Sequence, residues 1–138
     1  MEYMVFRWPV RILFIDTDAS GRIHYTALLR YFEAAEIELF REAGAWEHRS
    51  EVAFPRVHVE CDYRSAIYFD DELIIELTIG NMGRSSVELL YRAMKKGIVA
   101  ASGKIVIAAM NPKTDQSTEI PPGLREKLGL WAAPRVRG

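Results

Sequence analysis

Two aspartates and a glycine precede the point where the sequence changes from a strand pattern to a helix pattern. Asp16, Asp18 and Gly21 lie within residues 16–25, directly before a long amphipathic segment. The free N–H groups at a helix start carry partial positive charge, so they can polarise a carbonyl oxygen and stabilise the oxyanion formed when it is attacked. A nearby aspartate can attack that carbonyl or activate a water molecule. The same residue types also fit an aspartate-rich turn that merely caps the helix.

A strand and a helix are expected to hold this segment in place. Residues 6–15 are rich in Val, Ile, Leu and Phe and predict a strand. Residues 25–43 predict a helix, because apolar residues recur at steps of three and four. Gly44 follows as the residue that ends this helix. The apolar face of the helix consists of Leu28, Phe32, Ala35, Leu39 and Ala43.

The second half of the chain predicts four consecutive strands, at residues 56–66, 72–79, 86–94 and 98–109. Residues 81–83 and 95–97 predict turns between them, and residues 123–128 a short terminal helix. The first of these strands alternates, with Val57, Val59, Cys61 and Tyr63 on one face and Arg56, His58, Glu60 and Asp62 on the other. This order predicts an α+β fold in which an antiparallel sheet wraps around one apolar helix.

Composition narrows the class of protein. With 138 residues and 49% hydrophobic content, the chain predicts one globular domain over residues 1–138. The balance of 18 basic and 19 acidic residues predicts no nucleic-acid partner, and no apolar run is long enough to predict a membrane span. The single cysteine, Cys61, and the absence of a signal-peptide pattern predict a cytoplasmic protein. Three scattered histidines predict no metal site.

The segment 14–21, continuing to Tyr31-Phe32-Glu33, resembles the opening motif of hotdog-fold acyl-CoA thioesterases of the 4-hydroxybenzoyl-CoA thioesterase-like branch. The resemblance extends from residue 10 to residue 128. It includes the acidic turn at 68–73, the hairpin at 82–86 and the closing Ile120-Pro121. It implies a hotdog fold, with a long central helix wrapped by a curved antiparallel sheet of about five strands. It also implies a homodimer or homotetramer whose active sites lie at the dimer interface.

The resemblance also implies site residues and a reaction. Asp18 would be the catalytic carboxylate, as nucleophile or as general base, in the hydrolysis of an acyl thioester to acid and thiol. The backbone N–H of Tyr25 would bind the thioester oxygen, and Gly21 would let the backbone approach the substrate. The coenzyme A part of the substrate would contact Arg84, Ser85 and Ser86. No metal or redox cofactor is implied.

Departures from the family pattern leave alternatives open. His24-Tyr25 is swapped relative to many relatives, so His24 is a candidate proton shuttle whose direction the sequence does not fix. Glu36 replaces a frequent arginine on the apolar helix face, where it would either form an ion pair or line a ligand cavity. The substrate would be an acyl-CoA or an acyl-carrier-protein thioester. The alternative functions are a non-catalytic hotdog module that binds such a ligand, or a structural oligomer.

Overall fold

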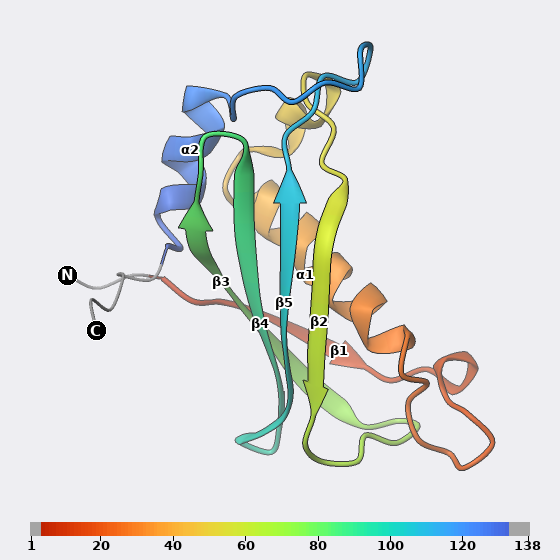
Figure 1. Cartoon of the computed structure of the whole chain (residues 1–138). Coiled ribbons are helices and arrows are strands. Elements are labelled where there is room, and N and C mark those ends of the chain that lie inside the picture. Colours follow the sequence, from red (N-terminus) through yellow and green to blue (C-terminus); the bar gives the residue numbers. More distant parts are fainter. Residues whose placement is uncertain (1–3, 133–138) are drawn as a thin grey trace, which may run out of the picture.

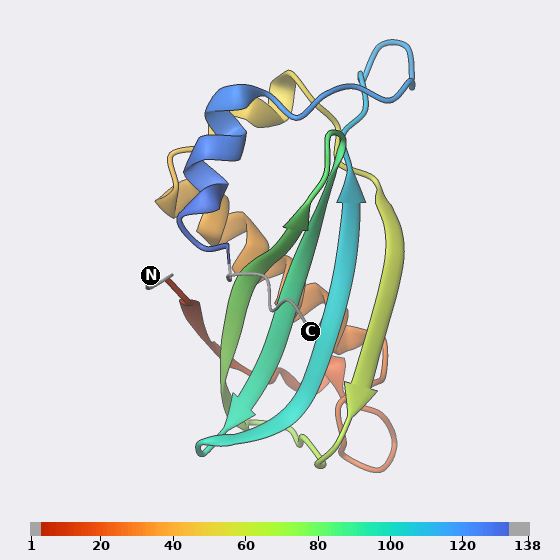
Figure 2. The same cartoon turned by 60° about the vertical axis from the view of Figure 1, so that its left-hand side comes forward.

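The computed structural model describes residues 4–132, which form one antiparallel sheet and two α-helices. The sheet has the strand order β1-β3-β4-β5-β2, and the long helix α1 (Ala27–Glu42) packs against one of its faces (Figure 1). The shorter helix α2 (Pro122–Gly129) lies beside the C-terminal end of α1 (Figure 2). The α+β prediction is therefore confirmed. The strands are β1 (Phe6–Arg11), β2 (Arg56–Tyr63), β3 (Glu72–Met82), β4 (Ser86–Lys95) and β5 (Ile98–Ala108).

The apolar face of α1 forms the centre of the core. Leu28, Phe32, Ala35 and Leu39 are all fully buried, as their spacing predicts. The ring of Phe32 stacks on Tyr91 of β4 with centroids 4.5 Å apart. A Cβ at Gly103 of β5 would lie 2.7 Å from the Phe32 ring, so a glycine there lets helix and sheet approach closely. The apolar contact of α1 with the sheet thus depends both on the spacing of the apolar residues in the helix and on the glycine at position 103.

The ends of α1 show how the chain enters and leaves the helix. The helix starts at Ala27, two residues later than predicted. The Ala27 N–H donates to the His24 carbonyl at 2.9 Å, and the Thr26 N–H donates to His24 Nδ1 at 3.2 Å, so residues 24–26 form a capping turn. At the other end Gly44 has φ +69°, the left-handed conformation expected after a helix.

The prediction that residues 6–15 form one strand is wrong in its second half. β1 ends at Arg11, and Phe14–Asp16 form a short 3-10 turn, η1. The Leu13 N–H donates to the Tyr31 hydroxyl at 3.0 Å instead of to a neighbouring strand. The turn buries Asp16 and exposes Phe14 and Ile15, which are 74% and 84% exposed. Long-range contacts with α1 therefore override the apolar run.

The edge strand β2 departs from a plain alternation at its start. The register with β5 shifts between Arg56 and His58, which indicates a β-bulge. The bulge turns Arg56 toward α1, so its predicted place on the polar face is wrong. Val57 and Val59 are 61% and 46% exposed, because β2 has a neighbour only in β5. The strand also ends at Tyr63 rather than residue 66.

The remaining boundaries agree with the sequence to within one residue, except at the end of β3. This strand continues to Met82 through a register shift after Ile79, so the predicted turn at 81–83 lies partly in the strand. The β4–β5 hairpin turns at Lys96 and Gly97, whose φ angles of +51° and +78° are those of a tight two-residue turn. The segment between α1 and β2 contains a 3-10 turn, η2 (Trp46–Ser50).

Candidate active site

A hollow of about 390 Å³ lies where the loop before α1 meets the segment that follows β2. The loop is fixed to that segment by backbone hydrogen bonds, from the Ile23 N–H to the Ile67 carbonyl at 2.7 Å and from the Phe69 N–H to the Gly21 carbonyl at 3.2 Å. Two predicted site residues share this hollow, Asp18 and Tyr25. Its lining comprises Asp18, Arg22, Ile23, Tyr25, Tyr63, Arg64, Ser65, Ala66 and Ile67.

Asp18 is held by one of its two carboxylate oxygens. Its Oδ1 accepts hydrogen bonds from the Ser20 N–H at 2.8 Å and the Ser20 hydroxyl at 2.6 Å. These bonds from Ser20 lower the pKa of Asp18 below its ordinary value. The backbone and the charge of Arg22 lower this pKa further. Asp18 is therefore ionised at neutral pH, and Ser20 holds only Oδ1, so that Oδ2 is left to face a substrate or a water molecule.

The N–H of Tyr25 is uncommitted as well. The neighbouring N–H groups are all used, since His24 donates to the Asp16 carbonyl, Thr26 to His24 Nδ1 and Ala27 to the His24 carbonyl. Among the described residues the Tyr25 N–H has no acceptor. A free N–H at a helix start is suited to a developing negative charge on an oxygen.

Asp16 plays a different part from Asp18. It is only 3% exposed, and it accepts hydrogen bonds from the Tyr31 hydroxyl at 2.6 Å and from the Arg30 guanidinium. The Tyr31 bond, followed by Arg30, lowers the pKa of Asp16. Because Tyr31 and Arg30 belong to α1, Asp16 fixes the loop to the helix.

His24 and Gly21 shape the loop and are not among the residues that line the hollow. His24 Nδ1 lies 3.2 Å from the Thr26 backbone nitrogen and 2.8 Å from the Thr26 hydroxyl, and the ring stacks on Tyr25 with centroids 4.8 Å apart. The imidazole thus holds the turn that precedes α1, at the N-cap residue Thr26. Gly21 has φ +80°, which an L side chain rarely adopts.

The predicted coenzyme A contacts lie at the other end of the sheet. Ser86 pairs with Ala108, whereas Ala93 pairs with Ala101, the partner of Tyr63. From Ala93 to Ser86 the strand covers roughly 23 Å, at about 3.3 Å per residue. Within one chain, the β3–β4 turn with Arg84, Ser85 and Ser86 is therefore far from Asp18 (Figure 1).

Glu36 forms a buried ion pair. Both Glu36 carboxylate oxygens lie 2.7 Å from Arg56 Nη2. Oε2 of Glu33, which is more exposed, lies 3.2 Å from the same nitrogen. Burial raises the pKa of Glu36, and the Arg56 charge opposes that rise. Glu36 does not line the hollow at Asp18. Of the two alternatives for Glu36, the geometry shows the ion pair.

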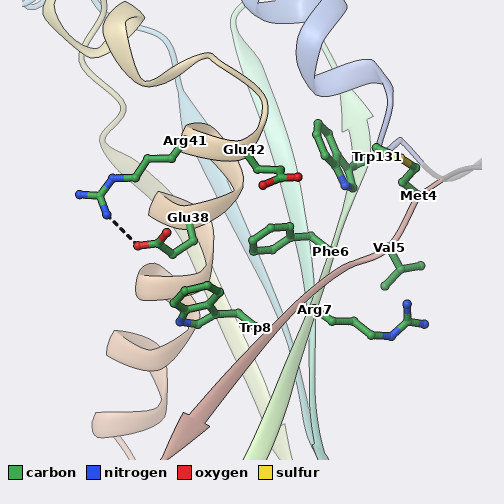
Figure 3. A pocket seen from close by; sticks show the side chains of 9 residues that line it. All are labelled: Met4, Val5, Phe6, Arg7, Trp8, Glu38, Arg41, Glu42 and Trp131. Atoms are coloured by element: carbon green, nitrogen blue, oxygen red, sulfur yellow. Dashed lines mark hydrogen bonds and ion pairs between the residues drawn. The ribbon is translucent and has the colours of Figure 1, made fainter.

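A second hollow, of about 580 Å³, lies between β1 and the C-terminal half of α1 (Figure 3). Phe6, Trp8 and Trp131 face it from one side, and an ion pair between Arg41 and Glu38, 2.7 Å long, flanks it on the helix. None of the predicted site residues lines this hollow. In residues 4–132 no group of three His, Cys, Asp or Glu side chains is placed to hold a metal ion, and no helix is long and apolar enough to cross a membrane.

Two residues of the site region were not predicted from the sequence. Tyr63 donates its hydroxyl hydrogen to the Tyr25 carbonyl across the hollow, and Arg56 is the partner of Glu36. The alternation of apolar and polar residues predicts only that Tyr63 lies on the apolar face of its strand. A tyrosine that alternates with apolar residues is an amphipathic signal, but nothing in the sequence identifies its acceptor.

A long helix packed against a five-stranded antiparallel sheet is the arrangement of the hotdog fold, so the predicted hotdog fold is confirmed. The chain belongs to the thioesterase-like superfamily, whose family model matches residues 12–128. Its fold and family are those of thioester hydrolases, and the chain is an enzyme of that class.

Named relatives are similar over most of their length. The chain is 31% identical over 126 residues to a 1,4-dihydroxy-2-naphthoyl-CoA hydrolase of Synechococcus elongatus, covering 88% of this chain and 93% of the relative. It is 25% identical to the acyl-CoA thioester hydrolase YbgC of Escherichia coli, covering 81% and 87%. A solved gentisyl-coenzyme A thioesterase superposes with a TM-score of 0.80 at 25% identity, covering 88% and 98%.

Proposed function

We propose that Asp18 and the Tyr25 N–H cleave the thioester of an aromatic acyl-CoA to a carboxylic acid and free coenzyme A. The observation that carries this proposal is the shared hollow, which is lined by both residues. Each has one uncommitted group there, the Oδ2 of Asp18 and the N–H of Tyr25. Acyl transfer needs two groups, a nucleophile or general base and a hydrogen-bond donor to the oxyanion.

In the reaction, the thioester oxygen accepts a hydrogen bond from the Tyr25 N–H, and this bond strengthens as negative charge develops on the oxygen. Asp18 acts by one of two routes. As general base it takes a proton from water, which attacks the carbonyl carbon. As nucleophile it forms an acyl-aspartyl anhydride and expels the thiolate, and water then hydrolyses the anhydride. The chain and water supply every group that either route uses.

The two routes differ in where solvent oxygen first appears. In a single turnover in H₂¹⁸O, water attack on the anhydride at the Asp18 carbonyl carbon places ¹⁸O in the side chain of Asp18. The general-base route places ¹⁸O only in the acid product. Mass spectrometry that finds ¹⁸O in the peptide containing Asp18 therefore establishes the anhydride route.

The proposed acyl class rests on the lining of the hollow and on the relatives. Tyr25 and Tyr63 provide two aromatic walls, and Ile23 and Ile67 provide apolar ones. Aromatic side chains favour flat aromatic ligands by offset stacking, worth about 0.5–1.5 kcal/mol beyond burial. Two of the relatives are named for hydroxylated aromatic acyl groups. We expect aromatic acyl-CoA esters to exceed aliphatic esters in kcat/KM.

The open edge of β2 supports a homodimer. β2 leaves one row of backbone groups unpaired, and its side chains Val57, Val59 and Tyr63 are exposed. Unpaired edges with exposed apolar side chains favour strand pairing. Two β2 strands that pair antiparallel about a two-fold axis run in opposite directions. The partner's β3–β4 turn then lies at the same end of the joined sheet as Asp18.

This arrangement would bring Arg84, Ser85 and Ser86 of one protomer toward the site of the other, where they could contact the nucleotide of coenzyme A. We place the enzyme in the cytoplasm, because its one cysteine, Cys61, has no partner for a disulfide. Burial raises the pKa of the Cys61 thiol, which also keeps it unreactive.

The test is thiol release from aromatic, short-chain and long-chain acyl-CoA esters, with wild type beside Asp18→Asn. Asp115→Asn is the matched control, because Asp115 is an exposed aspartate in the loop after β5. We expect wild type and the control to turn over and Asp18→Asn to lose activity by orders of magnitude. Full activity in Asp18→Asn would refute the assignment. If the protein binds acyl-CoA esters and carrier-protein thioesters but hydrolyses none of them, the result would favour the non-catalytic binding module.

A further inference from the structure

The hydroxyl of Tyr63 connects the edge strand β2 to the start of α1. It donates to the Tyr25 carbonyl, although the two residues are 38 positions apart in the sequence. Both side chains line the hollow that contains Asp18. Burial raises the pKa of Tyr63 well above the ordinary tyrosine value, so the phenol remains a hydrogen donor through the neutral range.

The direction of the Tyr25 N–H depends on two peptide planes. In a trans peptide the N–H points opposite to the carbonyl of the same plane. The His24 carbonyl, which shares a plane with the Tyr25 N–H, accepts the Ala27 N–H at 2.9 Å. The following plane contains the Tyr25 carbonyl, and its described side-chain partner is the Tyr63 hydroxyl. The first plane is therefore held by the Ala27 N–H, and the next is held on its carbonyl side by Tyr63 and on its N–H side by His24 Nδ1, which accepts the Thr26 N–H.

We propose that Tyr63 is a positioning residue, whose hydroxyl fixes the backbone at Tyr25 so that the Tyr25 N–H is directed at the thioester oxygen. The proposal rests on the proposed function, in which that N–H is the oxyanion donor. Tyr63 contacts none of the reacting atoms through its hydroxyl, because its hydrogen bond is committed to a backbone carbonyl. A small displacement of an oxyanion donor weakens its interaction with the transition state more than its interaction with the substrate.

The experiment compares Tyr63→Phe, which removes only the hydroxyl, with Tyr68→Phe as a matched control on the neighbouring loop. Tyr68 is 41% exposed, and its ring contacts the Arg22 and Lys95 side chains. We expect Tyr63→Phe to lower kcat about tenfold, below the roughly hundredfold or greater loss when an oxyanion donor is itself removed. KM is expected to stay within about twofold of wild type. The loss should be equal on an acyl-CoA and on the truncated acyl-N-acetylcysteamine ester.

A second readout does not depend on turnover. In the Asp18→Asn background, the carbonyl stretch of a bound ¹³C-labelled acyl-CoA reports the hydrogen bond to its oxygen. We expect Tyr63→Phe to reduce the red shift of this band and Tyr68→Phe to leave it unchanged. Because only ligand bound to folded protein contributes to the red-shifted component, a loss of folded material lowers its intensity and does not change its position.

Two results would overturn the proposal. One is an unchanged kcat and carbonyl band in Tyr63→Phe. The other is a lower kcat with an unchanged band and a lower melting temperature, which would assign Tyr63 a purely structural role. Failure of the proposed function itself is recognised separately, because wild type would then release no thiol from any ester.

Discussion

The ion pair between Glu36 and Arg56 makes a quantitative prediction about stability. The Glu36 side chain is 10% exposed and the Arg56 side chain 27% exposed. Replacement of Arg56 by Met removes the partner of a buried carboxylate, a change that costs about 3–5 kcal/mol in buried pairs. Because Arg56 is partly exposed and Glu33 shares it, we expect the lower end, about 3 kcal/mol.

This energy converts to a measurable shift in melting temperature. At about 2.1 cal/mol/K per residue, the chain of 138 residues unfolds with an entropy of roughly 0.29 kcal/mol/K. A loss of about 3 kcal/mol then lowers the Tm of Arg56→Met by about 10 °C. The measurement is thermal unfolding at one fixed protein concentration, since the Tm of an oligomer depends on concentration.

The dependence on pH follows from the raised pKa of Glu36. Burial raises this pKa, and loss of Arg56 removes the charge that opposes the rise, so the pKa rises further in Arg56→Met. A carboxyl with a raised folded-state pKa stabilises the fold below its unfolded value and destabilises it as the pH rises through the folded value. The difference in Tm between variant and wild type should therefore shrink as the pH falls from 8 toward the ordinary glutamate range.

A double-mutant cycle supplies the refutation. Because well-packed apolar residues can replace a buried pair at little cost, Glu36→Leu combined with Arg56→Met should restore most of the lost stability. Additive single effects, with a coupling below about 0.5 kcal/mol, would show that the two side chains do not act as a pair.

Three further predictions test the loop and the edge strand. Asp16→Asn should lower stability by about 1.5 kcal/mol at pH 7, because the charge-assisted bonds from Tyr31 and Arg30 weaken. The lowered pKa of Asp16 means that this contribution is fully present above the ordinary aspartate value and is lost as the pH falls through the lowered folded-state value, so chemical denaturation of wild type and variant should converge in acid. Gly21→Ala should cost about 1–2 kcal/mol, because φ is +80°, and equal denaturation midpoints would contradict this. Val59→Lys should convert a dimer to a monomer in light scattering, whereas an unchanged mass would exclude β2 as the interface.

The elements that could be predicted are those whose evidence is local. The period of Leu28, Phe32, Ala35 and Leu39 gives one face of α1 directly, and all four are buried. The end of β1 could not be predicted in this way. Residues 12–15 are apolar like a strand, yet the Tyr31 hydroxyl takes the Leu13 N–H. Tyr31 is 18 residues from Leu13 in the sequence, and its hydroxyl reaches the Leu13 N–H only when α1 packs against the sheet.

The candidate site likewise contains residues that local sequence predicts and residues that it does not. Asp18 and Tyr25 are close in sequence, so a single turn brings them to one hollow. Tyr63 and Arg56 act on residues 38 and 20 positions away, through a strand register and a bulge that the alternation of apolar residues does not encode. Long-range polar contacts of this kind depend on tertiary packing and leave little trace in local patterns.

The capping of α1 bears on the alternative that Asp18 is only a capping residue. A carboxylate that capped the helix would accept free N–H groups of the first helical turn, but no side-chain hydrogen bond caps α1. Here His24 takes the Thr26 N–H, and Ser20 holds one oxygen of Asp18. The negative charge therefore stays beside the helix start without consuming the Tyr25 N–H. If Asp18 is the reacting group, Asp18→Asn should abolish turnover and lower the Tm by no more than a few degrees, because Asp18 is exposed and the amide oxygen still accepts the Ser20 bonds. A larger drop in Tm would assign Asp18 a structural role.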